Sequence, residues 1–200
     1  MSDEAPERAQ PEDGSQALPE QHPVKRTPAR RSIMETVWTV VIALALALLI
    51  RQFVVESFVV QGVSMLPNLQ NGEHLLVNKF IYDLHPPRIG NVIVFLPPPA
   101  AHTNQDFIKR VIAVPGDTVA VRHGQVYVNG RLQPHPYLPS SYLGGPAFPQ
   151  ETVPPGYVFV LGDNRKVSDD SRYFGFVPIR NIRGQAEFAW WPPQVVGSIS

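Results

Sequence analysis

The stretch that organises this chain is Gly62-Val63-Ser64-Met65-Leu66-Pro67-Asn68-Leu69, in which a serine lies in a short kinked segment. An apolar run precedes it, and the turn dipeptide Asn71-Gly72 follows it. Farther along, Lys109 lies within an apolar strand pattern at 107–114, and residues 162–172 form a polar segment. We interpret the three segments as parts of one active site, with a serine nucleophile, a lysine base and a supporting loop.

The length and composition of the chain limit both its fold and its chemistry. Its 200 residues allow one medium domain with appendages. The 17 basic and 17 acidic residues give zero net charge, so no overall basic field indicates a nucleic-acid partner. The absence of cysteine excludes disulfides and thiolate chemistry. No cluster of His, Asp and Glu has metal-ligand spacing, so we expect neither a metal site nor a cofactor.

Residues 1–32 are polar, contain several prolines and lack both aromatic residues and a periodic apolar pattern. Such a segment cannot bury enough apolar surface to offset the entropy that it would lose on ordering. We therefore predict a disordered N-terminal tail over 1–32. The tail ends in a basic cluster, Lys25, Arg26, Arg30 and Arg31.

Residues 33–52 are strongly apolar, and between Val37 and Ile50 only Thr39 is polar. Three interpretations compete. A cleavable signal peptide would end in an A-x-A-like cleavage site, and nothing after Ile50 fits one. A buried helix of a soluble protein would carry polar residues along one face, and the segment from Val40 to Ile50 has none. We therefore predict a single transmembrane helix at 33–52.

This predicted helix is short, because its uncharged part, 36–50, falls below the about 20 residues that a full span needs. Glu35 and Arg51 can lengthen it if their side chains snorkel to the membrane interface. Cations cluster before the helix, whereas only Arg51 stands just after its uncharged part, 36–50. By the positive-inside rule, the N-terminus then lies in the cytoplasm and everything after Ile50 lies outside.

Residues 53–200 have the pattern of a mainly β domain. Apolar, β-branched and aromatic runs alternate with turn dipeptides such as His123-Gly124 and Asn129-Gly130, and no long segment has helical periodicity. The expected strands are 53–60, 74–80, 91–96, 107–114, 118–122, 125–128, 157–161 and 185–190. Residues 132–155 are rich in proline and contain Gly144-Gly145, so we expect an extended surface loop there.

A serine hydroxyl is a poor nucleophile until a base takes its proton. Lysine can be that base when burial lowers its pKa, because desolvation disfavours the charged form. On a strand, Lys109 would share an apolar face with Phe107, Val111 and Ala113. The competing interpretation is a surface lysine on an edge strand, and Arg110 on the other face leaves open which cation is solvated.

Histidine is the commoner base, and the chain contains six. All except His74 lie in the tail or in turns and loops rich in proline and glycine. His74 opens a strand after Ser64, but no carboxylate motif stands out as the group that would orient it. A Ser-His-Asp triad stays open as an alternative, although nothing in the pattern favours it.

Four segments of the chain resemble the motif boxes of the bacterial type I signal peptidases (leader peptidases), and they occur in that family's order. They are 62–69, Lys79-Phe80, 109–117 and 162–172, within a similar region of roughly 33–191. The resemblance implies an antiparallel β catalytic domain of the signal-peptidase type, behind an N-terminal membrane anchor. It also implies a serine endopeptidase with a Ser–Lys dyad.

The resemblance assigns roles to individual residues. Ser64 matches the nucleophile, Lys109 the general base, and Ser168 a residue that orients the lysine amine through a hydrogen bond. Asp170 and Arg172 match a supporting ion pair. The family has shallow pockets that accept small substrate side chains. The residues that match the walls of these pockets are Phe58, Val60, Met65, Leu69, Leu75, Phe107 and Ile108.

Two further features of the loop and the nucleophile segment follow. Asp163, Asn164 and Arg165 are expected to hold the loop rather than to take part in the chemistry. The backbone N–H of Ser64 matches one oxyanion donor. Some family members carry a second donor, a serine, where this chain has Gly62, so the second donor stays open here.

The resemblance therefore implies an enzyme that removes signal peptides from secretory preproteins after small residues of the Ala-x-Ala type. Its partners would be preproteins and the lipid bilayer, with no nucleic acid. We expect a single-pass protein of the bacterial cytoplasmic membrane, with the catalytic domain on the outer face. A non-catalytic β-module is a rival, against which the presence of both Ser64 and Lys109 argues. A self-cleaving repressor is another, but it needs a DNA-binding domain that we do not expect in 1–52.

Overall fold

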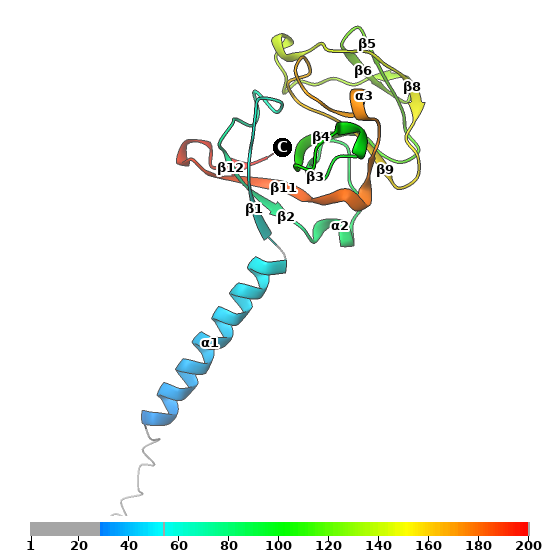
Figure 1. Cartoon of the computed structure of the whole chain (residues 1–200). Coiled ribbons are helices and arrows are strands. Elements are labelled where there is room, and N and C mark those ends of the chain that lie inside the picture. The colour runs from blue at the N-terminus through cyan, green and yellow to red at the C-terminus, as the bar shows by residue number, and fades with distance from the viewer. Residues whose placement is uncertain (1–28, 54, 200) are drawn as a thin grey trace, which may run out of the picture. The chain divides into compact units, whose positions relative to one another are not determined.

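A computed structural model describes residues 29–53 and 55–199 of the chain (Figure 1). The chain divides into two units, 1–42 and 43–200, and each is described by itself. Most of the predicted disordered tail, 1–28, lies outside the described residues. Its last part differs from the prediction, because residues 29–32 already belong to a helix.

Helix α1 (Ala29–Phe53) contains the apolar segment. Every side chain from 33 to 48 is exposed, including those of Trp38 and Leu44. The transmembrane helix predicted at 33–52 is not found, since no helix among the described residues combines the length and the apolarity needed to cross a membrane.

Residues 55–199 form two antiparallel sheets, which confirms the mainly β class. The larger, eight-stranded sheet has the order β1-β2-β11-β3-β4-β9-β10, with β12 paired to β11. Its strands are β1 (Val55–Val59), β2 (His74–Asn78), β3 (Val92–Phe95), β4 (Phe107–Ala113), β9 (Tyr157–Leu161), β10 (Val177–Pro178), β11 (Ile182–Trp191) and β12 (Gly197–Ser198). The smaller sheet has the order β7-β6-β5-β8 and consists of β5 (Thr118–Arg122), β6 (Gln125–Val128), β7 (Arg131–Leu132) and β8 (Phe148–Thr152).

The other elements of this unit are short. They are α2 (Ile81–Leu84), α3 (Ser171–Phe174) and the 3₁₀ turns η1 (Pro99–Ala101), η2 (Ser140–Tyr142), η3 (Ile179–Asn181) and η4 (Pro193–Val195). Each predicted strand is present, and β5, β6 and β9 have the predicted bounds. β11 is longer than predicted because it begins at Ile182, where it pairs with Phe95 of β3.

Strand β4 lies inside the larger sheet, between β3 and β9, and it carries the candidate lysine (Figure 1). Lys109 is the register partner of Ile93 on β3, and Val111 is the partner of Val160 on β9. Residues 109–113 are all buried. The interpretation of Lys109 as a surface lysine on an edge strand is therefore wrong.

The segment expected as a surface loop, 132–155, is more ordered than its composition indicates. Part of it forms β8, which pairs with β5 at the end of the smaller sheet. An edge strand tolerates Pro149, because a proline removes one ladder donor without interrupting an inner strand. Phe148 is 8% exposed and packs against Phe159, with ring centroids 4.8 Å apart. This apolar contact explains why β8 forms, although the proline content of the segment indicated a loop.

Candidate active site

Ser64 lies in the turn between β1 and β2. Two neighbours hold the turn in place, because Met65 and Leu69 are both buried in one apolar cluster of the core. On the other side, Gly62 has a φ of 86°, which favours glycine, and its N–H donates to Asn71 Oδ1 at 2.8 Å. Ser64 itself stays half-buried, at the end of a turn that is fixed on both sides.

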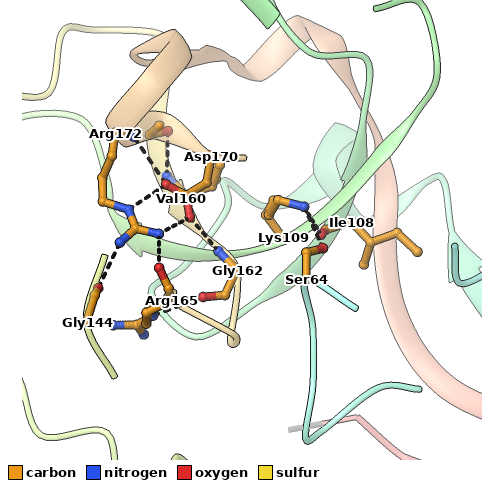
Figure 2. Close-up of polar contacts among 10 residues, drawn as sticks. Ser64, Ile108, Lys109, Gly144, Val160, Gly162, Arg165, Asp170 and Arg172 are labelled. Atoms are coloured by element: carbon orange, nitrogen blue, oxygen red, sulfur yellow. Dashed lines mark hydrogen bonds and ion pairs between the residues drawn. The ribbon is translucent and has the colours of Figure 1, made fainter. Parts of the chain in front are cut away.

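Lys109 reaches this turn from β4. Its side chain is only 4% exposed, and its Nζ lies 2.9 Å from Ser64 Oγ (Figure 2). The same amine donates to the carbonyl of Ile108 at 3.1 Å and lies 4.8 Å from the centre of the Phe107 ring. The structure therefore brings the predicted nucleophile and the predicted base into direct hydrogen-bonding contact.

Burial lowers the pKa of Lys109 from 10.5 to about 8. Desolvation is the largest cause, and the negative charges of Asp170, Asp169 and Asp163 oppose it. At pH 7, a pKa near 8 leaves roughly a tenth of the amine neutral, whereas an ordinary lysine leaves less than about a thousandth. A neutral amine at hydrogen-bonding distance from a hydroxyl has the geometry of a general base.

The alternative base, His74, has a different neighbour. Its ring packs edge-on against Trp190, with centroids 5.2 Å apart. Within the described residues, the side-chain partner of Ser64 Oγ is Lys109, and no group of three or more His, Asp or Glu side chains is arranged to hold a metal ion. The hydroxyl of Ser64 therefore faces the amine of Lys109 and not the ring of His74.

The predicted ion pair between Asp170 and Arg172 is present beside the dyad. Both side chains are fully buried, and the carboxylate accepts from Arg172 Nε and Nη2, each at 2.8 Å (Figure 2). Asp170 also accepts from the backbone N–H of Gly162 at 3.1 Å, and Arg172 Nη1 donates to the carbonyl of Gly144 at 3.0 Å. The pair thus fastens the end of β9 and the proline-rich segment to α3.

A second buried ion pair joins β4 to the same loop. Arg110 Nε and Nη2 donate to the two carboxylate oxygens of Asp163 at 2.9 and 2.8 Å, and the side chains are 2% and 0% exposed. Asn68, from the nucleophile turn, donates to Asp163 at 2.8 Å. Strand alternation alone left open which of Lys109 and Arg110 is solvated, and the structure buries both. The sequence feature that could have indicated this ion pair is that Arg110 and Asp163 both lie in the motif segments, 109–117 and 162–172.

The polar loop also holds the nucleophile through its backbone. The N–H of Asn164 donates to the carbonyl of Ser64 at 3.0 Å, and its side chain donates to the carbonyl of Val63 at 3.2 Å. Arg165 is 1% exposed, and its Nε donates to the carbonyl of Gly162 at 3.0 Å. These residues hold the loop against the Ser64 turn, as their positions in the sequence indicated.

Ser168 differs from its predicted arrangement. It is 2% exposed, but the structure has no hydrogen bond from its hydroxyl to Lys109, and among the described residues Oγ has no partner. Ser168 nevertheless lies beside the nucleophile turn, because a Cβ added to Gly162 would overlap both Ser168 Oγ and the carbonyl oxygen of Ser64. The orienting hydrogen bond stays a prediction.

A groove of about 560 Å³ opens at the dyad. Five of the predicted pocket residues line it: Phe58, Val60, Met65, Phe107 and Ile108. Leu69 and Leu75 do not, because they are 3% and 0% exposed in the core cluster that holds the turn. Charged side chains also reach the groove, namely Asp106, Lys109 and Asp169. The groove is thus mostly apolar, with a few charges near the reacting groups.

Comparison with known proteins finds one matching family model and several similar proteins. Residues 33–191 match the family model described as "Signal peptidase, peptidase S26". The chain is 43% identical over 174 residues to probable signal peptidase I-1 of Synechocystis sp., covering 84% of this chain and 87% of the relative. It is 41% identical over 167 residues to signal peptidase I of Bacillus caldolyticus, covering 78% and 90%. A crystal structure of a signal peptidase I from Enterococcus faecalis V583 has 35% identity and a TM-score of 0.42, and the match covers 50% of this chain and 97% of that one.

Proposed function

The chain belongs to the peptidase S26 family, the signal peptidases, and on that premise we propose that it cleaves signal peptides with Ser64 as nucleophile and Lys109 as general base. One observation carries the proposal: the buried amine of Lys109 lies 2.9 Å from Ser64 Oγ. Burial also moves the pKa of that amine to about 8, so a neutral fraction exists at working pH.

In the first half of the reaction, neutral Lys109 takes the proton of Ser64 Oγ, and the oxygen attacks the carbonyl carbon of the scissile bond. The oxyanion accepts from the backbone N–H of Ser64. Gly62 N–H donates to Asn71 Oδ1 at 2.8 Å, and the second donor stays open. The Lys109 ammonium then gives its proton to the leaving amine, and the acyl group stays on Ser64. In the second half, Lys109 activates a water that hydrolyses this ester.

The supporting residues act through position. Asp170 and Arg172 hold the loop that carries Ser168, and we propose that the Ser168 hydroxyl accepts a hydrogen bond from the Lys109 amine during the reaction. Its Oγ is buried and has no other partner among the described residues, so it is available for this contact. Such a bond would keep the amine aimed at Ser64 while its charge changes.

The groove suits small side chains at the cut. Apolar walls from Phe58, Met65 and Ile108 favour alanine-like residues and exclude large ones by overlap. We therefore propose an Ala-x-Ala type of specificity, with secretory preproteins as substrates.

The exposed apolar surface of α1 supports a location at the membrane. Its side chains from 33 to 48 are exposed and, apart from Glu35, uncharged. We propose that this segment attaches the enzyme to the bacterial cytoplasmic membrane, with the catalytic unit on the outer face.

The test is cleavage of a preprotein by the full chain in detergent, followed by identification of the new N-terminus. We expect release after an Ala-x-Ala sequence by the wild type and none by Ser64→Ala. Phenylalanine or lysine in place of the residue before the cut should block release. Binding of the preprotein without cleavage would instead support a non-catalytic β-module.

A further inference from the structure

When Lys109 is neutral, as the proposed mechanism requires, the groove carries more negative than positive charge. Asp106, Lys109 and Asp169 are the charged residues that line it. Because the base acts as a neutral amine, the charges that remain at the groove are those of the two aspartates. The reactive form of the enzyme, with Lys109 neutral, therefore presents a negative potential to the peptide that binds before Ser64 attacks.

The two aspartates differ in what surrounds them. Asp106 pairs with Arg183, whose Nε lies 3.4 Å from the Asp106 carboxylate. Asp169 is exposed, and within the described part of the chain no cation lies at ion-pair distance from its carboxylate. It stands next to Ser168 in the loop beside the dyad, and its charge is felt at the Lys109 amine. Asp169 is thus the uncompensated charge nearest to the chemistry.

We propose that Asp169 is a specificity-determining residue, which favours basic and disfavours acidic substrate side chains close to the cleaved bond. This inference rests on the proposed peptidase function. A peptide lying along the groove passes the Asp169 carboxylate, which attracts a lysine or arginine and repels a glutamate or aspartate. Because Asp169 is exposed, water and salt weaken its effect. We therefore expect kcat/KM for a peptide with Lys to exceed that for the same peptide with Glu by about two- to five-fold at a single position.

The experiment compares peptides that share one Ala-x-Ala core and carry Lys, Gln or Glu at single positions on either side of the cut. The full chain in detergent should give a higher kcat/KM with Lys than with Glu at one or more of these positions. Asp169→Asn should bring the Lys/Glu ratio close to one, whereas Asp169→Glu keeps the charge and should preserve it. High salt should lower the ratio in the wild type but change it little in Asp169→Asn.

Asp83→Asn is the matched control, because Asp83 is exposed on α2 and does not line the groove. It should keep the wild-type ratio. Turnover of the Gln peptide shows in each variant that the enzyme is folded. If the wild type cleaves all three peptides with equal kcat/KM, or if Asp169→Asn keeps the preference, the inference is overturned while the peptidase function stands. Failure of the wild type to cleave any peptide overturns both.

Discussion

Arginine at position 109 separates the two roles that a buried cation can have. It keeps the charge and approximate length of lysine, but its pKa above about 12 prevents it from accepting a proton. We predict that Lys109→Arg loses activity about as fully as Lys109→Ala and Ser64→Ala, measured as a single-turnover rate on a preprotein. The double variant of Ser64 and Lys109 should lose little more, because members of one catalytic unit are non-additive. A rate above a few per cent of wild type in Lys109→Arg would contradict the dyad and direct attention to His74.

The lowered pKa of Lys109 sets the pH dependence of the rate. Below about pH 8 the amine is increasingly protonated, so the rate should fall up to about tenfold per pH unit and should level off above pH 8. Asp163, Asp169 and Asp170 all stabilise the ammonium form. Asp169→Asn removes one of these charges, which lowers the pKa of Lys109 further and should move the acid limb to lower pH. If the acid limb of the pH–rate profile stays at the same pH in Asp169→Asn, or moves to higher pH, the limb reports the titration of a group other than Lys109.

At the scale of the elements, the expected strands were predictable because runs of apolar, β-branched and aromatic residues lie between turn signals. Ser64 and Lys109 were recognisable for a related reason, since each lies in a distinctive local segment. The contacts of Arg110 were not predictable from alternation, because a buried guanidinium depends on a carboxylate that the fold brings from residue 163. Likewise, β8 depends on pairing with β5 and on the contact of Phe148 with Phe159, which no local signal contains.

The pair between Arg110 and Asp163 connects strand β4 with the polar loop. Asp163→Ala would leave a guanidinium that is 2% exposed without its carboxylate. Removing one member of a buried pair typically destabilises a protein by about 3–5 kcal/mol. We predict a loss of this size in denaturant unfolding. Glu56→Ala is the control, because its pair with Lys79 is exposed and should contribute less than about 1 kcal/mol. Equal effects of the two substitutions would contradict a structural role for the buried pair.

Gly162 lies where β9 ends and the polar loop begins. A methyl group there would overlap Ser168 and the carbonyl of Ser64, so Gly162→Ala should displace the loop or the nucleophile turn. We predict a large loss of peptidase activity, measured as kcat/KM, with the β-sheet signal in circular dichroism retained. Gly197→Ala is the comparison, because a Cβ there meets only one atom, at 4.0 Å. Near-normal activity of Gly162→Ala would mean that this close packing does not position the dyad.

At the scale of the molecule, three segments far apart in the sequence meet at the proposed catalytic unit. The β1–β2 turn carries the proposed nucleophile, β4 the proposed base, and the loop after β9 makes the backbone contacts that hold the turn. Of the two buried ion pairs, Arg110–Asp163 joins β4 to the loop, whereas Asp170–Arg172 lies within the loop segment itself. We therefore expect the architecture to tolerate changes on the outer strands of the smaller sheet better than changes at the loop.

The membrane proposal places this catalytic unit on the outer face, and its prediction follows from charge and from peptide chemistry. Cations cluster before residue 33, which favours a cytoplasmic N-terminus, and signal peptides are exposed to a peptidase only after they have crossed. Protease added to intact spheroplasts should therefore digest an epitope placed after residue 60 and spare one within the first 25 residues. Lysed spheroplasts provide the control, in which both epitopes should be lost. Protection of the C-terminal epitope in intact spheroplasts would reverse the assigned orientation, because the catalytic groove would then face the cytoplasm.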